Sequence, residues 1–159
     1  MTIDEYNTTV KEFANRLCRF ADKLLLDTDT AKDVTQEAFL KLWENKGTIN
    51  GAKVKAWLFT TTYRLCINHI QRKKKMKGEE HIKEQVIHPD NPDLKDIINI
   101  AFATLTEIQR SVLLMRDYEG YSYQEIGEAL ELNESQVKVY LFRARQKIKD
   151  HIKDLKLVL

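Results

Sequence analysis

Residues that interrupt regular secondary structure are scarce in this chain, and several of them gather in one place. The sequence holds only two prolines and five glycines in 159 residues, and Gly78, Pro89 and Pro92 all fall between residues 78 and 93. On either side of this stretch, apolar residues recur at spacings of three and four, which is typical of amphipathic helices. The sequence therefore predicts an all-α protein with two small helical domains, residues 1–77 and 94–159, joined by a flexible linker at 78–93.

Three helices are expected in the first domain. Their apolar positions recur over residues 6–25, 31–43 and 54–70. Asp27, Thr28, Asp29 and Thr30 all offer oxygens that could cap the second helix, and Thr30 followed by Asp33 resembles a capping box. Each helix is expected to bury its apolar stripe against the other two.

The second domain contains three pairs of residues with the spacing of a capping box, each of which predicts the start of a helix. The pairs are Thr106 with Gln109, Ser122 with Glu125, and Asn133 with Gln136. The last two pairs predict a short helix at 122–130, a turn at 131–133 and a longer helix at 134–150. This order is a helix-turn-helix.

In a helix-turn-helix the second helix enters the major groove of DNA, and residues near its start contact the bases. The residues expected to face DNA there are Ser135, Gln136, Lys138, Val139 and Tyr140. The Gln136 amide can bind adenine, and the Lys138 ammonium can bind guanine or phosphate. The cations farther along that suit phosphate oxygens are Arg143, Arg145, Lys147 and Lys149.

Charge is segregated along the chain, although the net charge is only +2. Residues 46–77 carry nine Lys and Arg and no acid, and residues 134–159 carry seven against three acids. These two blocks predict two polyanion-binding surfaces. The first block also contains Trp57, Phe59 and Tyr63, and cationic grooves with aromatic faces bind single-stranded DNA. Trp57 has an alternative place in the core, because it lies on the apolar stripe of its helix.

Several kinds of protein are excluded by what the sequence lacks. No apolar run approaches the roughly 18 residues of a membrane span, and the first residues do not resemble a signal peptide, so a cytoplasmic protein without membrane insertion is expected. Two cysteines and four histidines without ligand spacing predict no metal site and no cofactor. Since phosphate-binding loops and nucleophile motifs are also missing, we expect no enzymatic activity.

Motifs in both halves of the chain resemble those of bacterial RNA polymerase sigma factors of the sigma-70 family. The second half has LTEIQRSVLL at 105–114, YEGYSYQEIGEAL at 118–130 and VKVYLFRAR at 137–145. The first half has DVTQEAFLKLW at 33–43, then a loop with Gly and Asn, then AWLF at 56–59. Within the family, the chain resembles the small extracytoplasmic-function (ECF, group 4) class, which lacks the additional domains of larger members.

The resemblance implies a protein that directs core RNA polymerase to specific promoters and initiates transcription by recognising the promoter and melting the duplex. The first domain would read and open the −10 element, and the second would dock on the −35 element. The residues expected in the base-capturing loop are Thr48, Ile49, Asn50, Gly51, Ala52 and Lys53. The further candidates for contacts to the −10 element are Lys55, Trp57, Thr60, Thr61, Arg64, Asn68, Arg72 and Lys73.

The second predicted helix has a different expected partner. Asp33, Gln36, Glu37 and Lys41 project from it at helical spacing, and the resemblance assigns this face to the clamp helices of the largest polymerase subunit. A solvated acidic face is the plainer interpretation of the same pattern. The resemblance also implies contact with the polymerase flap and inhibition by an anti-sigma factor.

The chain departs from the family pattern at three places that bear on promoter sequence. They are Glu131, where helix-turn-helix turns often have glycine, Val139-Tyr140 in the recognition helix, and Tyr63-Arg64 in the first domain.

Two other functions are also considered. A stand-alone helix-turn-helix regulator would leave the basic block at 46–77 unexplained, and a nuclease would need carboxylate clusters for metal that the sequence lacks.

Overall fold

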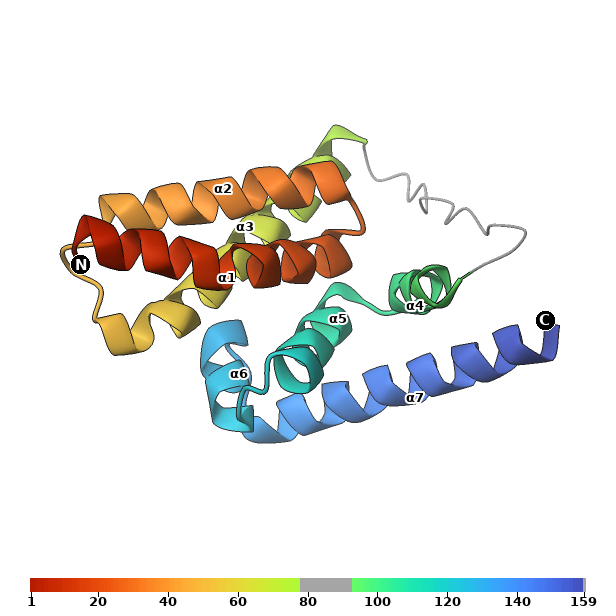
Figure 1. Ribbon diagram of the computed structural model, residues 1–159. Coiled ribbons are helices and arrows are strands. Elements are labelled where there is room, and N and C mark those ends of the chain that lie inside the picture. Colours follow the sequence, from red (N-terminus) through yellow and green to blue (C-terminus); the bar gives the residue numbers. More distant parts are fainter. Residues whose placement is uncertain (78–92, 159) are drawn as a thin grey trace. The chain divides into compact units, whose positions relative to one another are not determined.

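The computed structural model describes residues 1–77 and 93–158, and every regular element within them is helical (Figure 1). The chain divides into two compact units, Met1–His81 and Ile82–Leu159. The predicted all-α fold with two helical domains is thereby confirmed. The predicted linker lies outside the described residues except for Asp93, whose carboxylate accepts a hydrogen bond from the Asp96 amide at 2.8 Å and caps the next helix.

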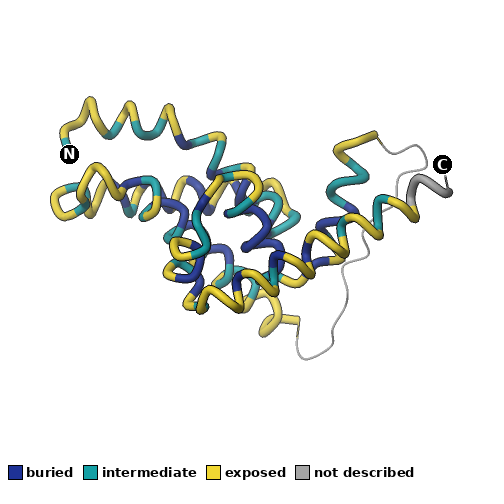
Figure 2. The backbone as a smooth tube through the Cα atoms, turned by 90° about the horizontal axis from the view of Figure 1, so that it is seen from below, coloured by how far each residue is buried: buried dark blue, intermediate teal, exposed yellow. Residues whose placement is uncertain are grey.

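The first unit consists of three long helices, α1 (Ile3–Leu25), α2 (Thr28–Glu44) and α3 (Val54–Met76), with a single 3₁₀ turn, η1 (Gly51–Lys53), leading into α3. α1 and α2 lie side by side and run in opposite directions, and α3 packs against both (Figure 1). Figure 2 shows that buried positions follow the inner sides of the helices. The core side chains include Leu17, Leu24, Val34, Leu42 and Leu58, all fully buried.

The connection between α1 and α2 differs from the predicted one. Leu26 adopts a left-handed conformation, with φ 57°, and its N–H donates to the Asp22 carbonyl at 2.7 Å to end α1. The following residue, Asp27, caps α2 by accepting hydrogen bonds from the amide and hydroxyl of Thr30, at 3.2 and 2.7 Å. The capping box predicted from Thr30 and Asp33 is therefore wrong, because the tight reversal after α1 starts α2 earlier and leaves Thr30 inside it.

The buried face of α3 is wider than the sequence pattern indicates. The structure buries Phe59, Thr62 and Cys66, while Trp57 and Thr61 are half-buried. Phe59 is 1% exposed and packs edge-to-face on Phe20, with ring centroids 5.5 Å apart. Phe59 is thus a core residue and is not available for base stacking. The physical reason is that α3 packs against two helices and so buries a broader face than one stripe.

The burial of Cys66 has a consequence for stability at high pH. Burial raises the pKa of its thiol from an ordinary 9.0 to about 12. Between these pH values the unfolded chain loses the thiol proton while the folded chain keeps it, so the free energy of unfolding falls by about 1.4 kcal/mol per pH unit. The contribution is present below pH 9 and is lost as the pH rises towards 12.

We therefore expect Cys66→Ala to flatten the alkaline loss of stability. Between pH 8 and pH 10.5, its free energy of unfolding should fall by about 2 kcal/mol less than that of the wild type. Urea titrations followed by tryptophan fluorescence measure this, since both tryptophans lie in the first unit. Cys18→Ala, at the half-buried cysteine, is the control for removing a thiol from the same unit. Equal slopes in wild type and Cys66→Ala would contradict the assignment.

The second unit begins with α4 (Leu94–Ala103) and α5 (Glu107–Leu113), followed by the π-helical turn η2 (Leu114–Tyr118). It continues with α6 (Tyr123–Leu130) and α7 (Glu134–Val158), and α7 packs against α4, α5 and α6. No helix in the described part of the chain is both long and apolar enough to span a bilayer.

The starts of α5, α6 and α7 are those that the sequence predicts. Reciprocal hydrogen bonds form the capping boxes at Thr106 and Gln109, Ser122 and Glu125, and Asn133 and Gln136. These bonds satisfy amide groups that the helices leave without internal partners. Between α5 and α6, η2 extends to residue 118 before Gly120 turns the chain with φ 72°.

Candidate nucleic-acid interface

The segment between α2 and α3 holds the six residues predicted to capture bases, and it is ordered by its own hydrogen bonds. The Thr48 hydroxyl and amide both donate to the Asn45 carbonyl at 3.0 Å. The Asn50 side-chain oxygen accepts from the Ala52 amide at 3.1 Å and caps η1. Five of the six residues are exposed, and Ile49 is half-buried. Asn50 is thus both a capping residue and an exposed side chain.

α3 presents a row of side chains to solvent directly after this segment. Trp57, Thr60, Arg64 and Asn68 follow one another at spacings of three and four, so they lie on one face of the helix. Arg64 and Asn68 are exposed, and Trp57 and Thr60 are half-buried. At the edge of this row lie Thr61 and Arg72. An indole on the same helix face as a cation and an amide suits the bases and phosphates of one strand. We call Trp57, Thr60, Arg64 and Asn68 the α3 row.

Lys55 and Lys73 lie on a different side of α3. They are eighteen residues apart, which is five helical turns, so they share a side that is roughly opposite the α3 row. Lys73 lies near the α1–α2 connection. There, the hydrogen bonds from Thr30 lower the pKa of Asp27, and the charge of Lys73 lowers it further. The structure therefore does not group these two lysines with the other candidates on α3.

α2 exposes an acidic face with an apolar residue in its middle. Asp33, Gln36 and Glu37 are exposed as predicted, and Lys41 is half-buried. Among them Leu40 is 56% exposed. The sequence interpretation missed Leu40, although its spacing from Gln36 and Glu37 places it on their face. An apolar centre with a polar rim is typical of a protein–protein interface.

The helix-turn-helix forms where it was predicted, and its turn depends on two residues. Glu131 adopts the left-handed conformation, with φ 59° and ψ 46°, which is the conformation that glycine usually supplies at such turns. In α6, the Gly127 carbonyl accepts from the Leu132 amide at 2.9 Å. A Cβ atom on Gly127 would lie 2.5 Å from the Leu132 carbonyl oxygen. Gly127 is thus needed for close approach, and its sequence signal is a glycine inside a helix.

The start of α7 exposes most of the residues predicted to face DNA. Ser135, Gln136, Lys138 and Val139 are exposed, and Tyr140 is half-buried. The Lys138 ammonium lies 3.4 Å from the Glu134 carboxylate, and both side chains are more than half exposed. Such an exposed pair contributes little free energy, so phosphate can replace the carboxylate at small cost.

Gln136 has a structural contact that the sequence interpretation did not include. Its side-chain oxygen accepts from the Asn133 amide at 2.9 Å as part of the capping box. Bidentate binding of adenine uses both the oxygen and the nitrogen of the amide. The amide oxygen has two lone pairs, so it can accept from adenine while it keeps this capping bond.

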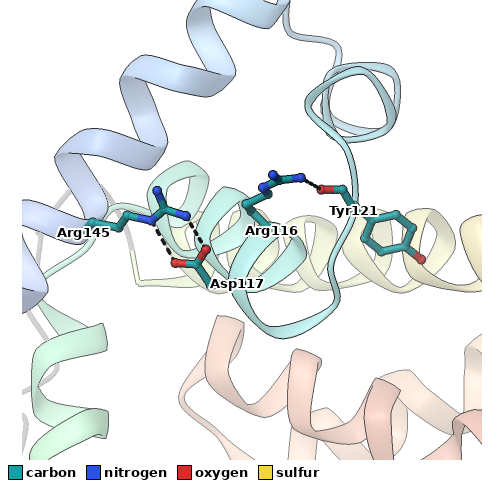
Figure 3. A network of polar contacts seen from close by, with 4 residues as sticks. All are labelled: Arg116, Asp117, Tyr121 and Arg145. Carbon is teal, nitrogen blue, oxygen red and sulfur yellow. Dashed lines mark hydrogen bonds and ion pairs between the residues drawn. The ribbon is translucent and has the colours of Figure 1, made fainter.

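Two of the predicted phosphate-binding cations are engaged within the second unit. The Arg145 guanidinium forms two hydrogen bonds with the Asp117 carboxylate, one of them 3.0 Å from Nε to Oδ2 (Figure 3). The Lys147 ammonium donates to the Gln109 side-chain oxygen at 3.2 Å. These contacts hold α7 against η2 and α5, whereas Arg143 is exposed. Figure 3 also shows the Arg116 guanidinium donating to the Tyr121 carbonyl, at 2.8 Å, between η2 and α6.

Two family models match the chain, one in each unit. The model of sigma-70 region 2 matches residues 9–76, and the model of sigma-70 region 4 matches residues 97–148. The first span contains the acidic face of α2 and the α3 row, and the second contains the helix-turn-helix. A stand-alone regulator is not favoured, because region 2 accounts for the basic block that this alternative leaves unexplained.

Similar proteins agree with this match. The ECF RNA polymerase sigma factor SigM of Bacillus subtilis is 26% identical over 159 residues, covering 94% of each chain. SigE of Mycolicibacterium smegmatis is 24% identical over 92% of this chain, which spans 61% of that relative. The fold is similar to that of the sigma factor RpoE solved with the anti-sigma factor NepR from Bartonella quintana, with a TM-score of 0.82, 22% identity and coverage of 95% and 98% of the two chains. The chain belongs to the sigma-70 family and is an RNA polymerase sigma factor of the extracytoplasmic-function type.

Proposed function

We propose that this sigma factor divides promoter recognition and polymerase binding among three surfaces. The acidic face of α2 binds core polymerase, the α3 row and the segment at 48–53 bind the −10 element, and the outer face at the start of α7 binds the −35 element. The observation that carries this proposal is the α3 row, where an exposed arginine and asparagine share one helix face with a half-buried indole inside a block without acids. Such a surface can hold a separated strand by phosphate contact and base stacking together.

The charge of each surface supports the same division. The nine cations of residues 46–77 attract phosphates, whereas Asp33 and Glu37 on α2 would repel DNA and favour a basic protein surface. On α7, Lys138 and Arg143 are exposed near the start of the recognition helix. Phosphate contacts by such cations position a helix in the groove.

We also propose a subgroup, a cellular location and a further partner for this protein. We assign the chain to group 4, since the 78–92 stretch between α3 and α4 is too short for an intervening domain. As a subunit of cytoplasmic RNA polymerase it acts in the cytoplasm and has no catalytic activity of its own. The solved RpoE–NepR complex supports an anti-sigma factor as a further partner.

Run-off transcription tests the proposed function. The purified chain is mixed with core polymerase and linear promoter DNA, and a product of defined length is the expected result. A shift of duplex DNA without core polymerase, and no product with it, would favour a stand-alone regulator instead. Metal-dependent cleavage of the template would favour a nuclease.

Within this function, Arg64→Ala should impair promoter opening far more than polymerase binding. Loss of a phosphate or stacking contact of this kind costs about 1–3 kcal/mol, so open-complex formation should fall about tenfold or more. Fluorescence of 2-aminopurine in the −10 element measures opening, and polarisation of labelled sigma factor measures binding to core polymerase. On a template melted beforehand, part of the defect should disappear.

Two variants serve as controls for Arg64→Ala. Arg19→Ala removes an exposed arginine from α1 of the same unit and should open the promoter normally. The double variant Asp33→Ala with Glu37→Ala should weaken polymerase binding more than opening. Equal loss of both activities in Arg64→Ala and in the double variant would contradict the proposed division.

A further inference from the structure

The outer face of α7 carries two exposed apolar side chains that do not contribute to the core. Val139 is 45% exposed and Phe142 is 69% exposed. They are three residues apart and therefore share one face of the helix. This face lies opposite the buried side chains of Val137, Leu141 and Ala144, which pack into the second unit.

Cations border this apolar pair on both sides. Lys138 and Lys149 lie along one edge and Arg143 along the other, by helical position, and all three are exposed. An apolar centre between two cationic edges complements a surface with anionic edges and a partly apolar floor. The major groove of DNA has this form, since phosphates line its edges and base edges form its floor.

The chemistry of the groove floor restricts which base can lie against these side chains. Guanine, adenine and cytosine present hydrogen-bonding groups there, whereas thymine presents a 5-methyl group. An apolar side chain against a hydrogen-bonding edge would leave that edge without a partner, which is unfavourable. Thymine is therefore the base that fits an apolar face.

We propose that Val139 and Phe142 contact thymine methyl groups in the −35 element and make recognition of this element depend on thymine. The inference rests on the proposed binding of that element by the second unit. Three residues of helix rise about 4.5 Å, little more than one base-pair step of about 3.4 Å. The two side chains therefore read thymines at adjacent or nearly adjacent positions.

Removal of single methyl groups from the DNA tests this proposal. A promoter fragment is selected from a random duplex library by binding to the holoenzyme, and each thymidine of its upstream element is replaced singly by deoxyuridine, which lacks only the methyl group. For a contacted thymine, the Kd of the wild-type holoenzyme should rise about fourfold, the effect of removing one buried methyl group. Val139→Ala and Phe142→Ala should each become insensitive to deoxyuridine at one of these positions.

Lys138→Ala is the matched control on the same helix. It should weaken binding to the thymidine and deoxyuridine fragments by the same factor and reduce the salt dependence, because phosphate contacts do not sense the methyl group. Equal affinity of the wild type for both fragments at every position would overturn the inference. So would a Phe142→Ala variant that keeps the deoxyuridine effect while losing affinity for another protein or a second copy of this chain.

Failure of the proposed function gives a different result. If randomising the whole upstream element does not change the affinity of the holoenzyme, the second unit does not read it at all. If randomising the element lowers the affinity but deoxyuridine does not, the second unit does read the element. The assignment of thymine contacts to Val139 and Phe142 is then wrong.

Discussion

Leu40→Asp should raise the Kd of the sigma factor for core RNA polymerase by roughly 30-fold or more. The side chain is 56% exposed in the free protein, so its burial has to come from a partner. Burying a leucine contributes about 1.5–3 kcal/mol, and a carboxylate in its place would have to be desolvated among other acids. A loss of at least about 2 kcal/mol corresponds to the expected factor.

The same substitution at another exposed leucine is the control. Leu94 is 73% exposed and opens α4 in the second unit, where an acid is compatible with the start of a helix. Leu94→Asp should bind core polymerase as the wild type does. Both variants should also unfold at nearly the wild-type temperature, since exposed substitutions change stability by about 0.5 kcal/mol or less. If both variants lose the same affinity, or neither loses any, α2 is not the polymerase-binding surface.

Gly127→Ala should destabilise the helix-turn-helix, although replacing glycine by alanine inside a helix normally stabilises it by about 0.5–1 kcal/mol. The new Cβ atom would lie 2.5 Å from the Leu132 carbonyl oxygen, and that backbone oxygen cannot rotate away as a flexible side chain can. Overpacking costs about 1–3 kcal/mol, and a contact this short to a backbone atom should cost close to the upper value. We expect a net loss of about 2 kcal/mol, which would lower the Tm of the second unit by roughly 8–16 °C.

Hydrogen exchange followed by mass spectrometry locates this effect. Amides of α6 and of the first half of α7 should exchange about 30-fold faster, while the tryptophan fluorescence of the first unit should not change. Gly51→Ala is the control, since no atom lies within 4 Å of its Cβ position, and it should leave exchange in the second unit unchanged. Unchanged or slower exchange in Gly127→Ala would show that the turn can move away from α6.

Features that depend on residues close in the sequence could be predicted without the structure. The capping boxes at Ser122 and Asn133 each join residues three positions apart, and the structure has both. The helical periodicity on either side of residues 78–93 likewise indicated two all-helical units. Together with the motifs of both halves, these local signals were sufficient to identify the family.

The sequence pattern was insufficient where two local signals competed or where distant segments meet. Asp27 and Thr30 could both cap α2, and the reversal at Leu26 decided between them. The pair between Arg145 and Asp117 joins residues 28 positions apart in the sequence, so no local pattern indicates it, and phosphate binding by Arg145 stays a prediction. The close approach of the Leu132 carbonyl that makes Gly127 necessary likewise appears only once the turn is folded.

The sequence by itself determined that the chain is helical, where most of its helices begin, and which segments carry positive charge. Hydrogen bonds within one turn of helix and the spacing of apolar residues determine these properties. Only the tertiary structure decided that Leu40 and Phe142 face solvent and that Phe59 does not. The physical reason is that exposure depends on which helices pack against a face, and helices distant in the sequence provide that packing.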